Sequence, residues 1–325
     1  MEVNTPIAED IRATDQNAQY DAACRKLLSE KIILAWIMKS CLEEYRDCGV
    51  KEIAEKYIEG TPQVGEVAIT PGETNATKVR GISNEDTVQG EGKVTFDIRF
   101  LAWAPVSGEL IQLIVNVEAQ GKLNTGYPMV KRAIYHCSRM ISAQYGTEFI
   151  HSEYQKIKKV YSIFVCMTTP KNRQNSITRY RLVEENLIGN VKEPVRNYDL
   201  MSAVMLCLGG AEGENYDGVL KLLDVLLSSE AGIAEKRQVL QDDFNIPMTE
   251  TLEAEVQVMC NLSQDVEEKG RIRGRAEGRI EGRAEGIAAS IKSLMDSMGW
   301  SMEQAMAALK ISEEERSQYA KLLNN

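Results

Sequence analysis

Two short apolar runs, rich in valine and isoleucine, stand out from the polar background of the chain. The runs are VTFDIRF at 94–100 and LIQLIVNVEAQ at 110–120, and a loop containing APVSGE separates them. β-Branched residues suit a pleated, half-buried surface, and a short turn between two such runs is typical of a hairpin. The pattern therefore predicts two neighbouring strands.

Each of these strands carries one acidic residue. Asp97 lies near the start of the first run and Glu118 near the end of the second. A carboxylate among apolar strand residues costs free energy unless it is paired, hydrogen-bonded or bound to a metal. Both acids are therefore candidates for a functional site. The alternative is that they are acids at strand ends whose side chains point to water. Gln120 lies on the same side of its strand as Glu118, because side chains alternate with period two.

The pattern also predicts the elements around this hairpin. Apolar residues recur at close to helical spacing over 21–46, and shorter helices are expected at 50–58 and 128–144. Pro128 suits the first turn of the last of these helices. A third strand is expected at 159–167. Because a helical crossover between strands favours a parallel connection, the order predicts a compact α/β fold.

The remaining segments are less regular. Residues 1–20 are expected to be flexible, and 60–93, rich in Gly, Pro, Asn and Thr, is expected to be irregular with one short strand at 64–69. Residues 170–200 are polar and ambiguous. The segment from 200 to 262 is predicted to be mostly helical.

A four-residue repeat follows at 267–287, EEKGRIRGRAEGRIEGRAEGI. Like charges four residues apart repel each other on a helix, and each glycine costs about 1 kcal/mol relative to alanine. A helix here becomes favourable if a second chain lies against it, and the alternative is a solvated tether. The repeated positions are Gly270, Gly274, Gly278, Gly282 and Gly286, with Arg271, Arg275, Arg279 and Arg283, and with Glu277, Glu281 and Glu285.

The last segment, 288–325, is predicted to be a small helical hairpin. Ser301 with Gln304, and Ser312 with Glu315, have the spacing of capping boxes at helix starts.

Composition narrows the function classes. The seven cysteines are scattered without a CxxC pair, which favours a reduced, cytoplasmic protein. Only two histidines are present, so a zinc site or histidine-dependent catalysis is not expected. No apolar run reaches membrane-spanning length, and the N-terminus lacks the features of a signal peptide. The net charge of −10 argues against tight nonspecific DNA binding but leaves room for a local basic face.

Carboxylates without histidine suit a hard cation. Mg²⁺ prefers oxygen ligands and is usually bound by one or two carboxylates together with waters and substrate phosphate. Such an ion activates water and stabilises the charge of a phosphodiester transition state. If the hairpin brings Asp97 to the rim that carries Glu118 and Gln120, the sequence predicts a site for Mg²⁺, or for Mn²⁺ or Ca²⁺.

Four segments resemble the PD-(D/E)XK nuclease superfamily, in particular its recombination-promoting nuclease (Rpn) and transposase-related branch. The segments are DIRF, NVEAQ, GYPMVKRAIYHCSRMISAQYGTEF and YQKIKKVYSIFVCM. The resemblance covers about residues 25–170 and extends to the Gly-Arg-Glu tail. It implies a restriction-endonuclease-like core at 21–200, with a mixed sheet flanked by helices. A helical extension would follow: a helical region at 201–266, the repeat at 267–287 and the hairpin at 288–325.

The resemblance also implies roles for individual residues. Asp97 and Glu118 match the metal-binding acids, the Ala119 carbonyl would add a ligand, and Glu30 matches an acid on the first helix. Gln120 stands where the family motif has lysine, a departure that this branch shares. Glutamine can position a water molecule, but it supplies no positive charge and is no base at neutral pH.

Nearby cations could replace the missing lysine. Lys122, Lys131 and Arg132 are the candidates, and the last two lie at the start of a predicted helix, where phosphate contact is favoured. A solvated helix face is the alternative for both. Gln144, at the far end of that helix, would either close the site or cap the helix.

The leading interpretation is a metal-dependent DNA endonuclease that acts in recombination, mobile-element biology or phage defence. It would assemble as a homo-oligomer through the repeat and have no membrane contact. Two alternatives remain: an inactive nuclease-fold module that self-associates or regulates a related protein, and an RNA-cleaving enzyme of the same fold.

Overall fold

The computed structural model describes residues 18–60, 63–64, 85–88, 92–95, 97–106, 109–122, 126–211, 213–228, 231–313, 316, 319–320 and 323. Within these ranges the side chains of 63–64, 85–88, 92–95, 106, 109, 122, 263–274, 276–277 and 280–281 are not described. The chain divides into two compact units, Met1–Gln264 and Asp265–Asn325. Residues 1–17, most of the expected flexible N-terminus, lie outside the description, whereas 18–20 are helical.

A mixed six-stranded sheet forms the centre of the first unit, in the order β1-β4-β5-β6-β8-β7. The predicted hairpin is confirmed, because β4 and β5 pair antiparallel. The crossover through the helix after β5 is also as expected, since β5 and β6 pair parallel, as do β6 and β8. The strands are β1 (Gln63–Val64), β4 (Ile98–Val106), β5 (Glu109–Lys122), β6 (Val160–Thr168), β7 (Ser176–Arg181) and β8 (Met201–Cys207). A separate hairpin joins β2 (Glu85–Val88) to β3 (Gly92–Thr95).

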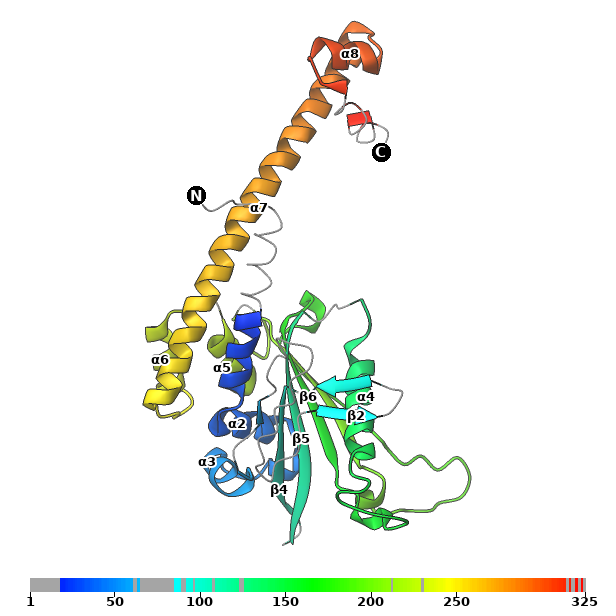
Figure 1. Ribbon diagram of the computed structural model, residues 1–325, viewed down its shortest axis with the longest axis vertical. Helices are drawn as coiled ribbons and strands as arrows, with labels where there is room; N and C mark the ends of the chain where they lie inside the picture. Colours follow the sequence, from blue (N-terminus) through cyan, green and yellow to red (C-terminus); the bar gives the residue numbers. More distant parts are fainter. Residues whose placement is uncertain are drawn as a thin grey trace. The chain divides into compact units, whose positions relative to one another are not determined.

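Helices cover both faces of this sheet, which confirms the expected α/β class (Figure 1). Val115 and Val117 of β5 belong to the core that contains residues of α2 (Lys31–Cys41) and α5 (Gly218–Leu227). Ile114 belongs to a second core with Ala133 and Cys137 of α4 (Met129–Ser142). Alternate residues of β5 thus face opposite layers.

Several short elements complete the first unit. They are a helix over residues 18–28, η1 (Glu43–Tyr45), α3 (Val50–Glu52), the π-helical η2 (Ile53–Tyr57), η3 (Tyr154–Lys156), η4 (Lys171–Arg173), η5 (Val195–Asn197) and α6 (Ile233–Asp242).

Two predictions of helical segments need correction. The expected helix over 21–46 is interrupted at Glu30, whose backbone is extended, and α2 ends at Cys41. The segment from 200 to 262 is not helical throughout, because Met201–Cys207 forms the buried strand β8. Its sequence MSAVMLC packs into both cores, so it has the uninterrupted apolar pattern that a buried helix and a buried strand share. The sheet therefore extends past residue 200.

The second unit is helical. The helix α7 runs over Glu250–Met298, with its first residues in the first unit, and α8 runs over Met302–Ala308, so the repeat at 267–287 is part of a helix. The predicted capping box at Ser301 is confirmed: its hydroxyl accepts from the Gln304 amide, and the Gln304 side chain accepts from the Ser301 amide. Glu315, of the other predicted box, lies outside the described residues. A small core contains Ile291, Ala305, Met306, Ile311 and Tyr319.

No helix in the described parts of the chain has the length and apolar character needed to cross a membrane.

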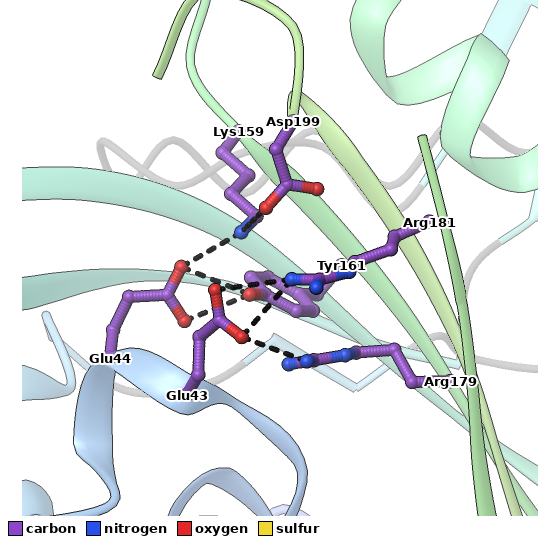
Figure 2. Close-up of polar contacts among 7 residues, drawn as sticks. All are labelled: Glu43, Glu44, Lys159, Tyr161, Arg179, Arg181 and Asp199. Carbon is purple, nitrogen blue, oxygen red and sulfur yellow. Dashed lines mark hydrogen bonds and ion pairs between the residues drawn. The ribbon is translucent and has the colours of Figure 1, made fainter. Parts of the chain in front are cut away.

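A buried polar network fixes one end of the sheet to η1 (Figure 2). Lys159, just before β6, donates to Glu44 over 3.0 Å and to Asp199, before β8, over 2.7 Å. Tyr161 donates its hydroxyl to Glu44 over 2.8 Å. Lys159 is thus shared by two buried carboxylates.

We expect Lys159→Met to lower the free energy of unfolding by about 3–5 kcal/mol, because it leaves these carboxylates buried without a counter-charge. Urea-induced unfolding would measure the loss. Lys221→Met is the matched control, since the ion pair of Lys221 with Asp243 is exposed and should contribute less than about 1 kcal/mol. Equal losses of stability in the two variants would show that burial of the carboxylates does not determine the cost of removing the lysine.

Candidate functional site

The candidate site lies on the face of β5 that is turned toward α4. Strand alternation places Asn116, Glu118 and Gln120 on this face, together with Ile114 of the α4-side core. Asp97 immediately precedes β4, whose first residue Ile98 pairs with Val117. The register of the hairpin therefore brings Asp97 beside Glu118.

The two acids are joined through each other's backbone. The Asp97 amide donates to Glu118 Oε1 over 3.2 Å, and the Ala119 amide donates to Asp97 Oδ2 over 3.0 Å. The guanidinium of Arg25, from the helix over 18–28, lies 3.5 Å from Asp97 Oδ1. Asp97 thus contacts groups from the start of the chain as well as from β5.

Glu118 is only 2% exposed and is surrounded by polar partners. Besides the Asp97 amide, it accepts from Asn116 Nδ2 over 2.9 Å. Arg132 Nη2 lies 3.5 Å from Oε2 and His136 Nδ1 lies 3.5 Å from Oε1. A buried carboxylate needs such partners, because an isolated charge in this position would be too costly.

Arg132 connects the strand to α4. It donates from Nη1 to Gln120 Oε1 over 3.4 Å and from Nη2 to Glu118 Oε2 over 3.5 Å. Its guanidinium also lies 5.7 Å from the centre of the Phe164 ring, a cation–π contact. A single cation therefore touches both Glu118 and Gln120.

The surroundings of Asp97 shift the pKa of its carboxyl group. Burial, reinforced by the nearby charge of Glu118, raises the pKa of Asp97 to about 7, although Arg25, the Ala119 amide and Arg132 oppose the shift. The cost of burying the charge thus outweighs the stabilisation that the two arginines and the Ala119 amide give to the carboxylate. A site of this kind favours a proton or a metal ion.

The donor set fits a hard divalent cation. Asp97 and Glu118 offer carboxylate oxygens, the ligands that Mg²⁺ prefers. Their contacts to Arg25 and Arg132 are 3.5 Å long, beyond the roughly 2.7–2.9 Å of tight charge-assisted bonds. The described residues contain no group of three or more acidic, His or Cys side chains arranged for a metal. Asp97 and Glu118 are the residues of this cluster that could hold such an ion, together with water.

The other residues predicted for the metal site lie less centrally. The Ala119 backbone lies against Asp97 through its amide. Glu30 is the N-cap residue of α2, and burial, followed by the charge of Glu255, raises its pKa, while Lys26 opposes this. Arg25, rather than Glu30, is the residue of this region that contacts Asp97.

The predicted phosphate-binding residues separate in the structure. Lys131 is exposed in the first turn of α4, next to Arg132. The side chain of Lys122 lies outside the described residues. Gln144 follows the far end of α4, where its buried amide donates to the Lys158 carbonyl over 3.0 Å and accepts from the Lys158 amide over 2.8 Å. Gln144 therefore closes the loop after α4 and does not belong to the site.

Sequence reasoning missed three residues of this cluster: Arg25, Asn116 and His136. Asn116 could have been recognised from the sequence, because it is a polar residue two positions before Glu118 in an otherwise apolar strand. His136 follows Arg132 by four residues, so the two share a helix face, and Arg132 Nε donates to His136 Nε2 over 3.5 Å. Arg25 could not have been recognised from the sequence, because its partner, Asp97, is 72 positions away.

Comparison of the chain with protein-family models, with curated proteins and with solved structures gives no match. The interpretation of the site therefore rests on its chemistry.

We expect Asp97 to destabilise the metal-free protein as the pH rises from about 4 to about 7. Its folded pKa of about 7 lies above the ordinary aspartate pKa of 3.8, so the folded state binds the proton more tightly than the unfolded state. The resulting stabilisation is complete below the unfolded pKa and is lost as the pH approaches the folded pKa.

The loss amounts to at most about 1.4 kcal/mol per pH unit. Urea-induced unfolding in the presence of a chelator, at several pH values, would measure it in the parent and in Asp97→Asn, which does not titrate. The free energy of unfolding of the parent should fall relative to that of the variant across this range. Parallel pH profiles would show that Asp97 titrates normally.

Proposed function

We propose that this chain is a divalent-metal-dependent endonuclease that hydrolyses phosphodiester bonds of DNA, in the manner of PD-(D/E)XK enzymes. The observation that carries the proposal is the Asp97–Glu118 pair, linked across the β4–β5 hairpin, with Arg132 held against Gln120. Neighbouring carboxylates on adjacent strands, beside a strand residue that can orient water, are the parts that such hydrolysis needs.

In this proposal Asp97 and Glu118 would hold Mg²⁺, and the Ala119 carbonyl would add a ligand. The bound ion would lower the pKa of water and stabilise negative charge on the phosphate. Gln120 orients the attacking water through its amide. His136, packed against Glu118 and Arg132, keeps both in place.

Arg132 supplies the charge that Gln120 lacks. Its guanidinium reaches the side chain at the position of the motif lysine, and it remains charged at all working pH values. A guanidinium can bind phosphate with two hydrogen bonds, so Arg132 would supply the positive charge that contacts the substrate phosphate. Lys131, exposed beside it, would contact the next phosphate of the backbone.

A second function has one observation in its favour. Glu118 is fully surrounded by Asn116, Arg132 and the Asp97 amide without any metal. The same cluster therefore also suits a nuclease-fold module that has become an interaction or regulatory protein, self-associating through the repeat at 267–287. Cleavage assays separate the two functions.

We expect the chain to nick supercoiled plasmid DNA only when Mg²⁺ or Mn²⁺ is present. Asp97→Asn and Glu118→Gln should each reduce the rate at least about 100-fold, because each removes a metal ligand while keeping the shape of the side chain. The exposed Asp47→Asn serves as the control for loss of one negative charge. Nicking that survives both site substitutions would refute the metal site, and matched RNA substrates would reveal a ribonuclease.

Arg132 should behave as the replacement for the motif lysine. We expect Arg132→Gln to lower the nicking rate by about 10- to 1,000-fold, and Arg132→Lys to restore part of it, because the rate depends on a positive charge at the phosphate. Lys171→Gln, at an exposed position in η4, controls for the change in net charge. Equal rates in Arg132→Gln and in the parent would remove Arg132 from the proposed mechanism.

A further inference from the structure

Two cysteines lie side by side near the carboxyl ends of β6 and β8. Cys166 and Cys207 are direct partners in the parallel register of these strands, and the Leu208 amide donates to the Cys166 carbonyl over 3.0 Å. Both side chains belong to the core on the α4 side of the sheet. The two thiols therefore start from neighbouring backbone positions and point to the same layer.

This arrangement has the backbone spacing of a disulfide. Neighbouring strands lie about 4.8 Å apart, and disulfides join residues whose Cα atoms are about 4.4–6.8 Å apart. Both residues are free thiols in the structure. A bond between them would therefore need rotation of the two side chains but no rearrangement of the sheet.

The two thiols also influence each other. A hydrogen bond between them raises the pKa of Cys166, and burial adds to this shift. The same bond lowers the pKa of Cys207 to about 7, with help from the Ser176 hydroxyl and the charge of Arg173, although burial opposes the shift. One member of the pair is thus the better thiolate and the other remains a thiol.

Other buried cysteines of this chain lack such support. Burial raises the pKa of Cys24, Cys41 and Cys137 to about 12. Because the thiolate is the nucleophile, these thiols are inert near neutral pH. Cys207, in contrast, reaches its thiolate form near pH 7.

Cys207 lies close to the surface, although it is only 3% exposed. Its second register partner is Ser176, a half-buried residue at the start of β7, which is an edge strand of the sheet. The preceding residues 171–174 are all exposed. An oxidant of about the size of a water molecule therefore needs only a local opening at this edge to reach the sulfur.

We propose that Cys166 and Cys207 form a reversible dithiol–disulfide site that hydrogen peroxide oxidises. The Cys207 thiolate attacks one peroxide oxygen, the O–O bond breaks, and the departing hydroxide takes up a proton, which leaves a sulfenic acid and water. Cys166 then attacks the Cys207 sulfur and releases a second water as the S–S bond forms. Two thiols are thus oxidised and one peroxide is reduced to two waters. A dithiol reductant restores both thiols by exchange.

The disulfide would lie next to the candidate site. Gln120 of β5, Cys166 and Cys207 are register partners in one row across three strands. The bond would also close a loop that contains β7. The redox chemistry itself needs neither metal nor substrate, so it can be tested whether or not the chain cleaves DNA.

The first test uses the full-length folded chain without any substitution. The protein is reduced, freed of reductant, treated with hydrogen peroxide at neutral pH, and then alkylated in denaturant. Trypsin places the two cysteines on separate peptides, 160–171 and 197–221. We expect mass spectrometry to find these peptides linked, at least about tenfold more often than any other cysteine pairing, because geometry excludes distant partners. Dithiothreitol should separate them. Absence of the linked peptides, or equal amounts of other pairings, would overturn the proposal.

Two substitutions assign the roles within the pair. Cys166→Ala should stop the reaction at the sulfenic acid of Cys207, which dimedone traps, whereas Cys207→Ala should leave Cys166 unoxidised. Cys137→Ala, at a buried cysteine of α4, is the control and should still form the disulfide. Circular dichroism checks that each variant is folded, and the test of the parent chain stands without them. Trapping at Cys166 in Cys207→Ala, or no trapping at Cys207 in Cys166→Ala, would overturn the assigned reaction.

Discussion

The burial of two carboxylates on neighbouring strands is the constraint on which the centre of this protein depends. Asp97 and Glu118 each accept a hydrogen bond from the backbone beside the other. A shift of one residue in the β4–β5 register would turn Glu118 toward the opposite, apolar core and leave it without its partners. The register, the acids and the position of Arg132 on α4 are consequently determined together.

The two ends of the sheet carry different polar clusters. Glu118 lies beyond the middle of β5, near the carboxyl end of the strand, where open α/β sheets commonly bind ligands, and Asp97 lies beside it just before β4. The network around Lys159 lies at the starts of β6 and β8 and joins them to η1. β6 and β8 are apolar on both faces between these regions, so polar groups concentrate where the strands begin and end.

Local patterns predicted much of this structure. The hairpin, α4, β6 and the cap at Ser301 follow from periodicity, turn residues and capping preferences, which are properties of neighbouring residues. The closeness of Asp97 to Glu118 was predictable, because two strands in a hairpin have a narrow choice of register. The strand at Met201–Cys207 was not, since burial on both faces removes the period that identifies a strand. The contact of Arg25 with Asp97 and that of Arg179 with Glu43 join segments far apart in sequence, about which local pattern carries no information.

The four-residue repeat in α7 has a consequence for the handedness of any assembly. An α-helix turns about 100° per residue, so each step of the repeat advances the glycine stripe by about 40° around the axis. Between Gly270 and Gly286 the stripe therefore drifts through almost half a turn. Periods longer than 3.6 residues give right-handed supercoils, whereas heptads give left-handed ones. A partner helix that follows this stripe must wind around α7 in the right-handed sense, opposite to that of an ordinary coiled coil.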